Sequence, residues 1–506
     1  MPLRDLVTNK MLVYLNSARS KLLQTEALSS ANLQHLDLSD NHISTLTGKD
    51  FTTVTMNLRV LILDGNPITS MFSDITSTRL TWPNLHTLSV SRIAKKTMNA
   101  GDVAKFPNLL TLNISYTGLD VVSKNGFQPI QRLRVLDLRG CPMTYFPQTI
   151  FVDLTDLTTV HADNYKLCCP ATLPEGFNLF NCHAPSDEVS SCGDLLQSGV
   201  YRVFIAVSAS LILVGNLTSF VYRVIIKGGE NRSSFGIIVS SLSVSDFLMG
   251  IYSGVIAAAD RWYLGKYLWN DVTWRESAVC KAAGFFSLLS TEVSAFIICL
   301  ITLDRFLVIR FPLKRDLHMT PRNAFITCVF AWAVGVVLAL VPLLPPTSHW
   351  QFYGQTGICI PLPFTREGFP GHSYSFGILI ILNFVLFLLI AAGQMSIYWS
   401  VRANSMRATA TTSTTQNLTI ARRLITVAMS DFLCWFPIGL LGLLASSGTP
   451  VSSEVNVAMA IFVLPLNSAL NPFLYTLNII LEKRRKVREQ RLQKLLLSRV
   501  EAMKQE

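Results

Sequence analysis

Apolar residues recur at a fixed short spacing through the first third of the chain. The pattern Leu-x-x-Leu-x-Leu-x-x-Asn-x-Ile begins at Leu33 and again at Leu58. Weaker copies begin at Leu85, Leu109, Leu133 and Leu157, so neighbouring copies start 24 to 27 residues apart. A period of this length predicts a solenoid in which each repeat supplies one short strand and buries its apolar positions against its neighbours. A degraded earlier repeat is expected between Leu12 and Leu23.

The period is that of leucine-rich repeats, an α/β solenoid whose strands line a concave surface. Side chains between the apolar positions of each strand point to that surface, because strand side chains alternate between the two faces. The charged concave residues are Asp37, Asp64, Asp137, Arg139 and Asp163. Four acids against one base predict an acidic binding stripe that suits a basic polypeptide. The alternative is an ordinary solvated face of the strands.

A different pattern begins near residue 200, where long runs carry no charge. The uncharged runs are 203–222, 323–365, 368–401 and 455–481. Three further apolar stretches hold the acids Asp246, Glu292 and Asp431. A membrane span needs about 20 apolar residues, and the pattern predicts seven spans, at 200–226, 235–260, 278–310, 323–345, 372–401, 419–447 and 453–480. Seven such segments exclude a soluble fold and predict an all-α transmembrane bundle.

Composition and charge agree with a membrane protein. Half of the residues are apolar and 15% are charged, whereas soluble chains carry about 25% charged residues. Residues 1–199 hold 16 basic and 17 acidic residues, and residues 200–506 hold 27 and 15, so the net charge of +11 comes from the second part. Because Lys and Arg concentrate in the loops after spans one, three and five and in the tail, these segments are expected in the cytoplasm. We therefore expect a multi-pass plasma-membrane protein with residues 1–199 outside the cell and no nucleic-acid partner.

Four cysteines cluster ahead of the first span, and they are Cys168, Cys169, Cys182 and Cys192. A vicinal bond would be strained, so the two crossed pairings remain open, and an extracellular location favours disulfides over zinc. The expected domains are a leucine-rich-repeat ectodomain (1–164), a cysteine-rich hinge (165–199), a seven-transmembrane domain (200–480) and a basic amphipathic cytoplasmic helix and tail (481–506). The segment after Met1 lacks an apolar leader, and the first repeat lacks a cap, so we expect an N-terminally incomplete chain.

Short motifs in the spans make the membrane domain specific. They are Gly215-Asn216, Leu242-x-x-x-Asp246, Asp304-Arg305-Phe306, Trp332, Cys434-Trp435-Phe436-Pro437 and Asn471-Pro472-x-x-Tyr475. Their order and spacing resemble the rhodopsin-like G-protein-coupled receptors, and the ectodomain narrows the resemblance to receptors that contain leucine-rich repeats. The stretches 246–252, 290–294, 430–437 and 464–472 are similar to the relaxin receptors and their invertebrate relatives. The resemblance covers about residues 30–485.

The resemblance implies two structural features of the bundle. A disulfide between Cys280 and Cys359 would tie the loop after span four to the head of span three. A cluster of buried polar side chains would hold an allosteric Na⁺ ion that steadies the inactive state, and it consists of Asp246, Ser294, Asn467, Ser468 and Asn471. Because an acid at membrane depth normally faces the bundle interior with partners, a hydrated polar network without a specific ion is the alternative. No structural metal and no other cofactor is expected.

The same resemblance implies residues for G-protein coupling and for switching. The coupling residues are Asp304, Arg305, Tyr398 and Tyr475, and in the family the arginine leaves its acidic neighbour to meet the G protein. Pro437 has no amide hydrogen, so span six should kink beside Trp435. The implied switch residues are Asp431, Trp435, Pro437, Asn467, Asn471 and Pro472, with Asp431 as a latch to an asparagine of span seven.

The function implied by the resemblance is that of a G-protein-coupled receptor for an extracellular peptide or protein hormone. A relaxin- or insulin-like peptide is favoured, with stimulatory G protein and cAMP as the output. One alternative is a glycoprotein-hormone-type receptor. Another is a non-signalling adhesion or decoy protein tethered to the membrane, although such a protein should lose Arg305 and Trp435, which are present. No nucleotide loop, metal-ligand spacing or nucleophile elbow occurs in the sequence, so no enzyme activity is expected.

Many relatives carry a second acid at the start of span six, where this chain has Asn417. Because Asn417 cannot form an ion pair with Arg305, we expect weak restraint of the inactive state and raised basal signalling. The substitution Asn417→Glu should lower basal cAMP in transfected cells at equal surface expression. Asn417→Gln, which adds length without charge, is the control, and unchanged basal cAMP in the glutamate variant would contradict the idea.

Overall fold

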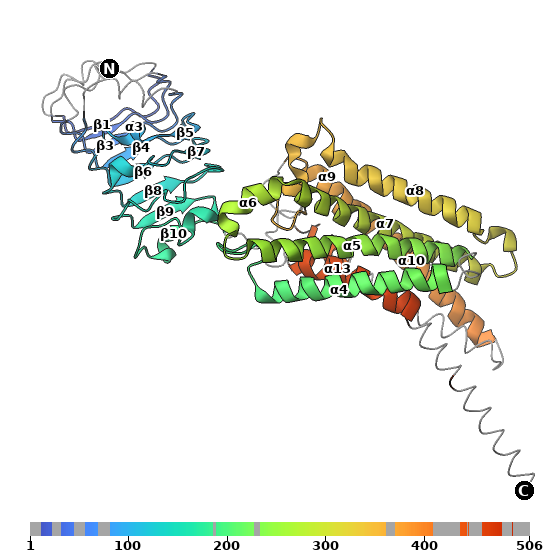
Figure 1. Ribbon diagram of the computed structural model, residues 1–506. Helices are drawn as coiled ribbons and strands as arrows, with labels where there is room; N and C mark the ends of the chain where they lie inside the picture. Colours follow the sequence, from blue (N-terminus) through green and yellow to red (C-terminus); the bar gives the residue numbers. More distant parts are fainter. Residues whose placement is uncertain are drawn as a thin grey trace, which may run out of the picture. The chain divides into compact units, whose positions relative to one another are not determined.

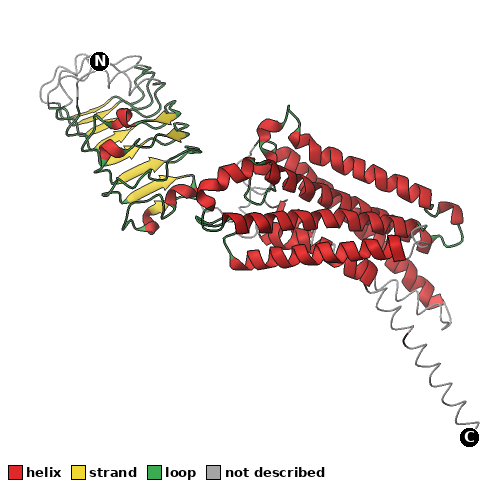
Figure 2. Cartoon of the chain, in the orientation of Figure 1, coloured by secondary structure: helices red, strands yellow, loops and turns green. Residues whose placement is uncertain are grey.

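The computed structural model describes most of the chain. The described residues are 12–22, 32–44, 56–68, 81–185, 189–226, 233–360, 370–407, 436–442, 444, 458–477 and 488. The chain divides into two compact units, residues 1–187 and residues 188–506. Strands occur in the first unit, and helices make up most of the described part of the second (Figure 2).

The first unit is a solenoid of parallel strands. Eight strands pair in the order β1-β2-β3-β4-β6-β8-β9-β10. They are β1 (Tyr14–Asn16), β2 (His35–Asp37), β3 (Val60–Ile62), β4 (Thr87–Ser89), β6 (Thr111–Asn113), β8 (Val135–Leu138), β9 (Thr159–Ala162) and β10 (Cys182–His183). A second, smaller sheet pairs β5 (Thr97–Met98) with β7 (Val121–Val122). Because β1 pairs in register with β2, the degraded repeat before Leu33 is present, as expected.

The short helical turns of the solenoid lie between its strands. They are α3 (Ala100–Val103) and the 3₁₀ turns η2 (Gln128–Ile130), η3 (Tyr165–Cys168) and η4 (Leu179–Asn181). One continuous apolar core runs under the main sheet, and it contains the repeat positions read from the sequence, such as Leu36, Leu61 and Leu88. This stacked arrangement agrees with the leucine-rich-repeat fold that the period predicts.

The asparagines of the two regular repeats form a buried ladder of hydrogen bonds. Asn41 is 2% exposed and Asn66 is fully buried. The Nδ2 atom of Asn66 donates to the carbonyl oxygens of Leu38 and Leu63, at 2.9 Å each, and its Oδ1 atom accepts the amide of Ile43 at 3.1 Å. The amide side chain therefore satisfies backbone groups that the turn between repeats leaves without strand partners.

The second unit is a helical bundle (Figure 1). Its long helices are α4 (Gly199–Val221), α5 (Ser234–Tyr263), α7 (Ala278–Arg310), α8 (Pro321–Leu340), α10 (Asn383–Arg407) and α13 (Leu464–Pro472), the last of which is extended at both ends by π-helical turns. Shorter ones are α6 (Tyr267–Glu276), α9 (His372–Phe376) and the 3₁₀ turns η7 (Arg315–Leu317), η8 (Val341–Leu343), η9 (Ser348–Trp350) and η10 (Phe352–Gly354). Four π-helical segments adjoin the long helices, namely η5 (Tyr222–Ile226), η11 (Gly377–Leu382), η12 (Met459–Val463) and η13 (Phe473–Leu477).

Six of the described helices are long and apolar enough to cross a membrane. They cover Gly199–Ile225, Ser234–Tyr263, Ala278–Arg310, Arg315–Leu343, His372–Ser400 and Met459–Thr476, close to six of the seven predicted spans. Most of the remaining span, expected at 419–447, lies outside the described residues, although 436–442 is helical. Of the 18 most apolar consecutive residues of α7, 72% are buried, whereas the corresponding share in the segment that contains α8 is 28%. Helix α7 is therefore central to the bundle.

Small hydroxyl side chains begin four of the long helices. Ser198 caps α4, Ser233 caps α5, Ser277 caps α7 and Thr320 caps α8. Each hydroxyl oxygen accepts a backbone N–H of the first turn at 3.1 or 3.2 Å. Because the first turn of a helix has no internal acceptors for its N–H groups, these residues define where the helices start.

The ladder can be tested with Asn66→Ala. The substitution removes three buried hydrogen bonds, and backbone groups are left without partners, so the ectodomain should lose about 3 kcal/mol of unfolding free energy. Pulse proteolysis of the ectodomain in the full-length receptor, across a urea series, measures this loss. The exposed Asn125 serves as the control, and Asn125→Ala should change stability by less than about 0.5 kcal/mol. Equal losses of unfolding free energy for the two variants would show that the buried hydrogen bonds of Asn66 do not stabilise the ectodomain.

Candidate functional site

A carboxylate lies fully buried in the middle of the bundle. Asp246 of α5 is 0% exposed. Its Oδ1 atom accepts hydrogen bonds from Ser294 Oγ of α7 at 2.8 Å and from Ser468 Oγ of α13 at 3.0 Å. Its Oδ2 atom accepts Asn471 Nδ2 of α13 at 2.8 Å. Because a buried carboxylate without donors is costly, these contacts join α5, α7 and α13.

The polar cluster extends from Asp246 to a fourth helix. Asn216 of α4 donates from Nδ2 to the carbonyl oxygen of Ser468 at 3.1 Å. Asn467, also predicted for the cluster, lies one turn before Asn471 and is buried, but no hydrogen bond joins it to Asp246 among the described residues. In the same part of the chain, the Oδ1 atoms of Asn467 and Asn471 accept no hydrogen bond. Carboxylate, hydroxyl and amide oxygens are the ligands that a hard cation prefers, so these residues fit Na⁺.

The predicted coupling pair lies near the end of α7. Arg305 donates from Nη2 and Nε to Asp304 Oδ2 at 2.7 and 3.1 Å. Ser234, in the first turn of α5, donates to Asp304 Oδ1 at 3.0 Å. The Asp304 side chain is 1% exposed, whereas that of Arg305 is 25% exposed. Both oxygens of the acid are thus engaged, and the guanidinium lies against its neighbour in sequence.

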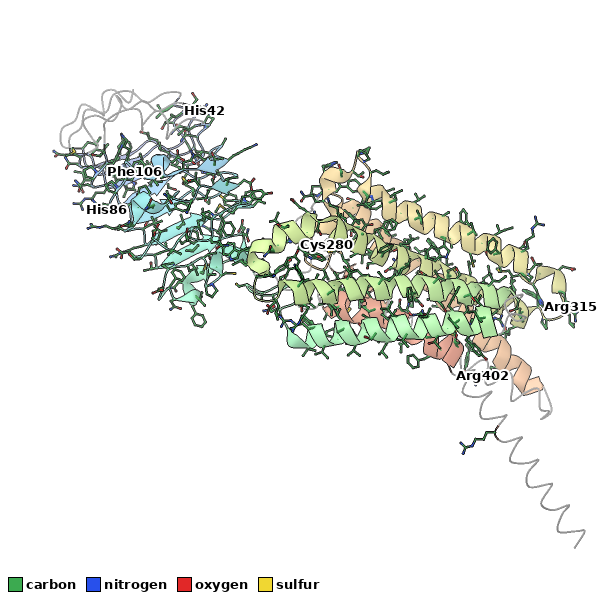
Figure 3. The ribbon with its side chains drawn as sticks, viewed as in Figure 1. His42, His86, Phe106, Cys280, Arg315 and Arg402 are labelled. Atoms are coloured by element: carbon green, nitrogen blue, oxygen red, sulfur yellow. A yellow bond between two sulfur atoms is a disulfide. The ribbon has the colours of Figure 1, made fainter. Side chains whose placement is uncertain are left out.

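The two predicted tyrosines do not share an environment. Tyr475 is 5% exposed and packs in the apolar cluster that includes α5, α7 and α10. Tyr398 of α10 is 37% exposed and stacks edge-on with Trp399. Arg402, which follows Tyr398 by four residues in α10, is labelled in Figure 3 and marks this end of the bundle. The structure therefore holds one phenol inside the bundle and leaves the other at its surface.

One apolar side chain near this end was missed by the sequence analysis. Leu313 follows α7 and is 94% exposed. Its loop is ordered by hydrogen bonds, since Lys314 N donates to the carbonyl oxygen of Phe311 at 3.1 Å and His318 Nε2 contacts the same oxygen at 3.0 Å. A projecting leucine on a structured loop suits insertion into a pocket of a partner. The only sequence signal was an apolar residue among the basic residues of a loop.

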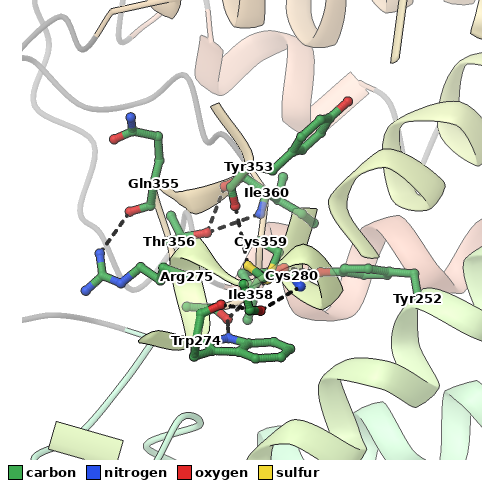
Figure 4. Close-up of a disulfide and its surroundings, with 12 residues drawn as sticks. Tyr252, Trp274, Arg275, Cys280, Tyr353, Gln355, Thr356, Ile358, Cys359 and Ile360 are labelled. Carbon is green, nitrogen blue, oxygen red and sulfur yellow. Dashed lines mark hydrogen bonds between the residues drawn. A yellow bond between two sulfur atoms is a disulfide. The ribbon is translucent and has the colours of Figure 1, made fainter. Parts of the chain in front are cut away.

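The predicted disulfide between Cys280 and Cys359 is present at the opposite end of the bundle (Figures 3 and 4). Three side chains fasten the loop that holds Cys359. Trp274 Nε1 donates to the Gly357 carbonyl at 2.8 Å, and Tyr252 OH donates to the Ile358 carbonyl at 2.9 Å (Figure 4). Tyr353 OH donates to the Ala339 carbonyl at 2.6 Å. The loop is therefore part of the core at this end.

The segment that leads into α4 is also built into this end. Leu195 and Leu196 are fully buried in the same apolar cluster as Cys280 and Cys359. Arg202 of α4 forms ion pairs with Asp194 at 2.5 Å and with Asp260 of α5 at 3.2 Å. Asp260 Oδ1 also accepts the Leu196 amide at 2.9 Å. This linker clamp of Asp194, Arg202 and Asp260 joins residues 189–198 to two helices, and the sequence analysis missed it.

Burial also shapes the chemistry of α6 beside the linker. Tyr267 is fully buried and donates to Asp271 Oδ1 at 2.5 Å, and Asp271 pairs with Arg275. Burial chiefly, with the negative charge of Asp271, raises the pKa of Tyr267 far above its ordinary value. The phenol is therefore a permanent hydrogen-bond donor to Asp271 within α6. The Tyr267 amide, which donates to the Gly193 carbonyl at 3.0 Å, joins α6 to the linker.

Glu292, which had no partner in the sequence analysis, contacts span five. Its Oε1 atom accepts Asn383 Nδ2 at 2.9 Å, and both side chains are buried. Asn383 begins α10 directly after the π-helical segment η11. A π-helical turn rotates the following residues relative to an α-helix, so the position of this asparagine could not be read from the period of the sequence.

Two of the predicted switch residues, Asp431 and Trp435, lie outside the described residues, and so does Asn417. Pro437 is described and half-buried in a helical segment. Pro472 is buried and lies inside the last turn of α13, followed by the π-helical η13. The latch between Asp431 and an asparagine stays a prediction.

The concave acids of the solenoid bond chiefly to their own sheet. Asp37 Oδ1 accepts Ser39 N and Oγ at 2.9 and 2.7 Å. Asp64 Oδ1 accepts Ser89 Oγ and Ser91 N at 2.7 Å each. These contacts fix the direction of each carboxylate and leave its charge in place.

The last two acids of the concave face, Asp137 and Asp163, have different environments. Arg139 pairs with Asp137 through Nη2 at 2.5 Å. Burial alone would raise the pKa of Asp137, but the hydrogen bonds and charge of Arg139 outweigh it and hold that pKa below its ordinary value. Asp163 Oδ2 accepts the Gly140 amide at 2.5 Å. The acidic stripe therefore has Asp37 and Asp64 without an ion pair among the described residues, whereas Arg139 pairs with Asp137 and also interacts with the charge of Asp163.

All four hinge cysteines are oxidised. Cys168 pairs with Cys182, which belongs to one of the two crossed pairings and excludes a vicinal bond. Cys169 and Cys192 are disulfide-bonded as well. No cluster of metal-ligating side chains occurs in the described stretches of either unit.

Comparison with known proteins places both halves of the chain. The model of the 7 transmembrane receptor (rhodopsin family) matches residues 215–475. The Leucine Rich Repeat model matches residues 32–53. The first match covers the helices that hold Asp246, Arg305 and Tyr475, and it spans just over half of the chain.

Named relatives match both the membrane unit and the ectodomain. The G-protein coupled receptor GRL101 of Lymnaea stagnalis is 39% identical over 331 residues, which is 65% of this chain and 29% of that protein. Relaxin receptor 2 of Homo sapiens is 30% identical over 323 residues, 63% of this chain and 42% of that protein. The lutropin-choriogonadotropic hormone receptor of Callithrix jacchus is 27% identical over 489 residues, 90% of this chain and 68% of that protein. The chain thus spans less than half the length of the first two relatives.

These matches agree with the geometry of the bundle, with its six described membrane-spanning helices and its buried carboxylate. They also agree with the solenoid of parallel strands that precedes it. The chain belongs to the rhodopsin family of seven-transmembrane receptors, as a multi-pass plasma-membrane protein with leucine-rich repeats and a relationship to relaxin and glycoprotein-hormone receptors.

Proposed function

We propose that this chain is a G-protein-coupled receptor for an extracellular peptide or protein hormone, with a relaxin- or insulin-like peptide favoured. The buried polar cluster around Asp246 carries the proposal. It joins α5, α7 and α13, and the coupling pair Asp304–Arg305 and Tyr475 belong to or follow two of these helices. Hydrogen bonds among such fixed partners can be exchanged between two satisfied arrangements, which is the property of a switch. A decoy that used only its solenoid would have no use for this cluster.

The partner on the inner side is a heterotrimeric G protein, and stimulatory G protein with cAMP is the favoured output. Lys and Arg concentrate in the loops at the end that holds Arg305, so this end and the tail face the cytosol and residues 1–199 face outward. Arg305 supplies a charge that can leave Asp304, and the exposed Leu313 supplies an apolar anchor beside it. Binding to the G protein would bury the apolar surface of Leu313, which contributes favourably to association.

The input reaches the bundle through the linker clamp. Residues 189–198 are packed with the Cys359 loop, and Arg202 holds them to α4 and α5 through Asp194 and Asp260. A hormone that shifts the linker therefore changes the contacts of two helices directly. The buried linker transmits the effect of hormone binding to the helices of the bundle.

An allosteric Na⁺ ion fits the polar cluster of the bundle. Asp246, Ser294 and Ser468 would supply its first oxygen ligands, and Asn467 and Asn471 have amide oxygens that accept no hydrogen bond among the described residues. The ion would add a positive charge beside a buried carboxylate, so it would stabilise the arrangement in which these helices are closest.

A glycoprotein-hormone-type ligand is the second candidate. The match to the lutropin-choriogonadotropic hormone receptor covers 90% of this chain and thus includes the ectodomain. A larger protein hormone would bind along the same concave surface. Screening the receptor against insulin-like peptides and against glycoprotein hormones separates the two classes.

The coupling role can be tested with Arg305→Ala in cells. The substitution removes the charge that would meet the G protein, so basal and hormone-stimulated cAMP should fall to the level of untransfected cells. Leu313→Asp should do the same, because it removes the apolar anchor. Arg322→Ala, at an exposed base of α8, is the control and should retain signalling at equal surface expression. If the wild type and Arg305→Ala raised cAMP and other G-protein outputs to the same level, the proposal would be contradicted.

The acidic stripe can be tested by comparing two isosteric changes. Asp64→Asn removes an acid without a basic partner in the described sheet, so binding of a basic peptide hormone should weaken by about tenfold. Asp137→Asn should weaken it less, because Arg139 already neutralises that carboxylate. Asp156→Asn, at an exposed site outside the strands, is the control. Binding of a labelled peptide to whole cells gives the affinities, and equal affinities for Asp64→Asn and the control would exclude this stripe as the binding face.

A further inference from the structure

An aromatic ring of α5 lies against the coupling arginine. The guanidinium carbon of Arg305 is 4.1 Å from the centroid of the Phe235 ring. Phe235 is half-buried and packs with the apolar cluster of α5, α7 and α8. A guanidinium over an aromatic face is attracted by the negative face of the ring, most strongly where water is excluded. Arg305 is therefore held by Phe235 as well as by Asp304.

The same turn of α5 holds both members of the coupling pair. Ser234 donates to Asp304, and its neighbour Phe235 lies under Arg305. The position of Phe235 beside Arg305 follows from the hydrogen bond between Asp246 and Ser294 on the same two helices. Phe235 precedes Asp246 by eleven residues and Arg305 follows Ser294 by eleven, which is about three turns on each antiparallel helix. The faces that meet at Asp246 and Ser294 therefore meet again at Phe235 and Arg305.

A second arginine connects this ring to the end of α13. The guanidinium carbon of Arg223 is 5.7 Å from the centroid of the Phe235 ring. Arg223 is 8% exposed and donates from Nη2 to the Tyr475 carbonyl at 2.6 Å and from Nε to Thr476 Oγ1 at 3.3 Å. One phenyl ring thus contacts the coupling arginine and the arginine that holds the segment containing Tyr475.

We propose that Phe235 is a positioning residue that holds Arg305 in the closed arrangement and takes the place of the acid that this chain lacks at Asn417. Arg223 joins the release of Arg305 to the movement of the Tyr475 segment, because both arginines share the ring. The proposal rests on the proposed G-protein coupling and adds to it a restraint that needs no acid in span six.

Substitutions at position 235 separate the ring face from its apolar volume. Phe235→Leu keeps an apolar side chain and removes the aromatic face, so basal G-protein activation should rise by about three- to tenfold. Phe235→Tyr keeps the aromatic face and should therefore keep basal G-protein activation at the wild-type level. Phe325→Leu, in the exposed part of α8 at 60% exposure, is the matched control for a phenylalanine-to-leucine change. Basal nucleotide exchange is measured with purified receptor in nanodiscs and with heterotrimers of each G-protein class.

A measurement without G protein tests the contact itself. Melting temperatures are compared for the wild type, Phe235→Leu, Arg305→Gln and the double variant in nanodiscs. If ring and guanidinium interact, Phe235→Leu lowers the melting temperature of the wild type and has a smaller effect when Arg305 is already replaced.

The two measurements distinguish the possible failures. Additive melting temperatures would overturn the proposal, because the contact would then contribute nothing. A non-additive pair with normal basal exchange in Phe235→Leu would also overturn it, because the contact would not restrain Arg305. A non-additive pair together with no exchange on any G protein, for any variant, would leave the contact standing and overturn the proposed function. A non-additive pair with raised exchange in Phe235→Leu alone supports both.

Discussion

A carboxylate in the centre of an apolar bundle must find hydrogen-bond donors, and the arrangement of the bundle follows from how Asp246 finds them. Its donors come from α7 and α13, and Asn216 brings α4 to the same place. Each contact fixes the rotation of a helix about its own axis, because a hydrogen bond tolerates little displacement. Once α5 and α7 are fixed at Asp246 and Ser294, their register three turns away is fixed as well.

The parts of this molecule that could be predicted from sequence are those with a period or a known motif. The repeat period predicted the solenoid, the apolar runs predicted the six described spans, and Asp246 was expected to gather polar partners. The contacts that were missed join residues far apart in sequence that no single motif contains. Asn383 reaches Glu292 only because η11 alters the rotation of span five, and Asp194, Arg202 and Asp260 come from three separate segments. Such contacts depend on how elements pack, which the local pattern does not encode.

The net charge of the concave face, counted along the sequence, did not show how its charges are arranged. Arg139 follows the last residue of β8 and lies two residues from Asp137, and the two side chains form an ion pair. Asp37 and Asp64 use their oxygens to bind hydroxyl and amide groups of their own sheet. A ligand bound to this face would meet carboxylates whose directions are already fixed, which would reduce the entropy lost on binding. The surface keeps the net charge counted from its sequence, and its carboxylates are held in fixed directions.

Helix α4 and the π-helical segment η5 that follows it contribute residues to the linker clamp, to the cluster around Asp246 and to the contacts of Phe235. Arg202 near its start belongs to the linker clamp, and Asn216 reaches the cluster around Asp246. Arg223, in the π-helical segment that follows, holds the Tyr475 carbonyl and lies against Phe235. Residues on one helix move together, because the backbone hydrogen bonds that join successive turns resist extension. A force on the linker that displaces Arg202 therefore strains the contacts of Asn216 and Arg223 at the same time, and no chain of side-chain rearrangements is needed to connect the two ends.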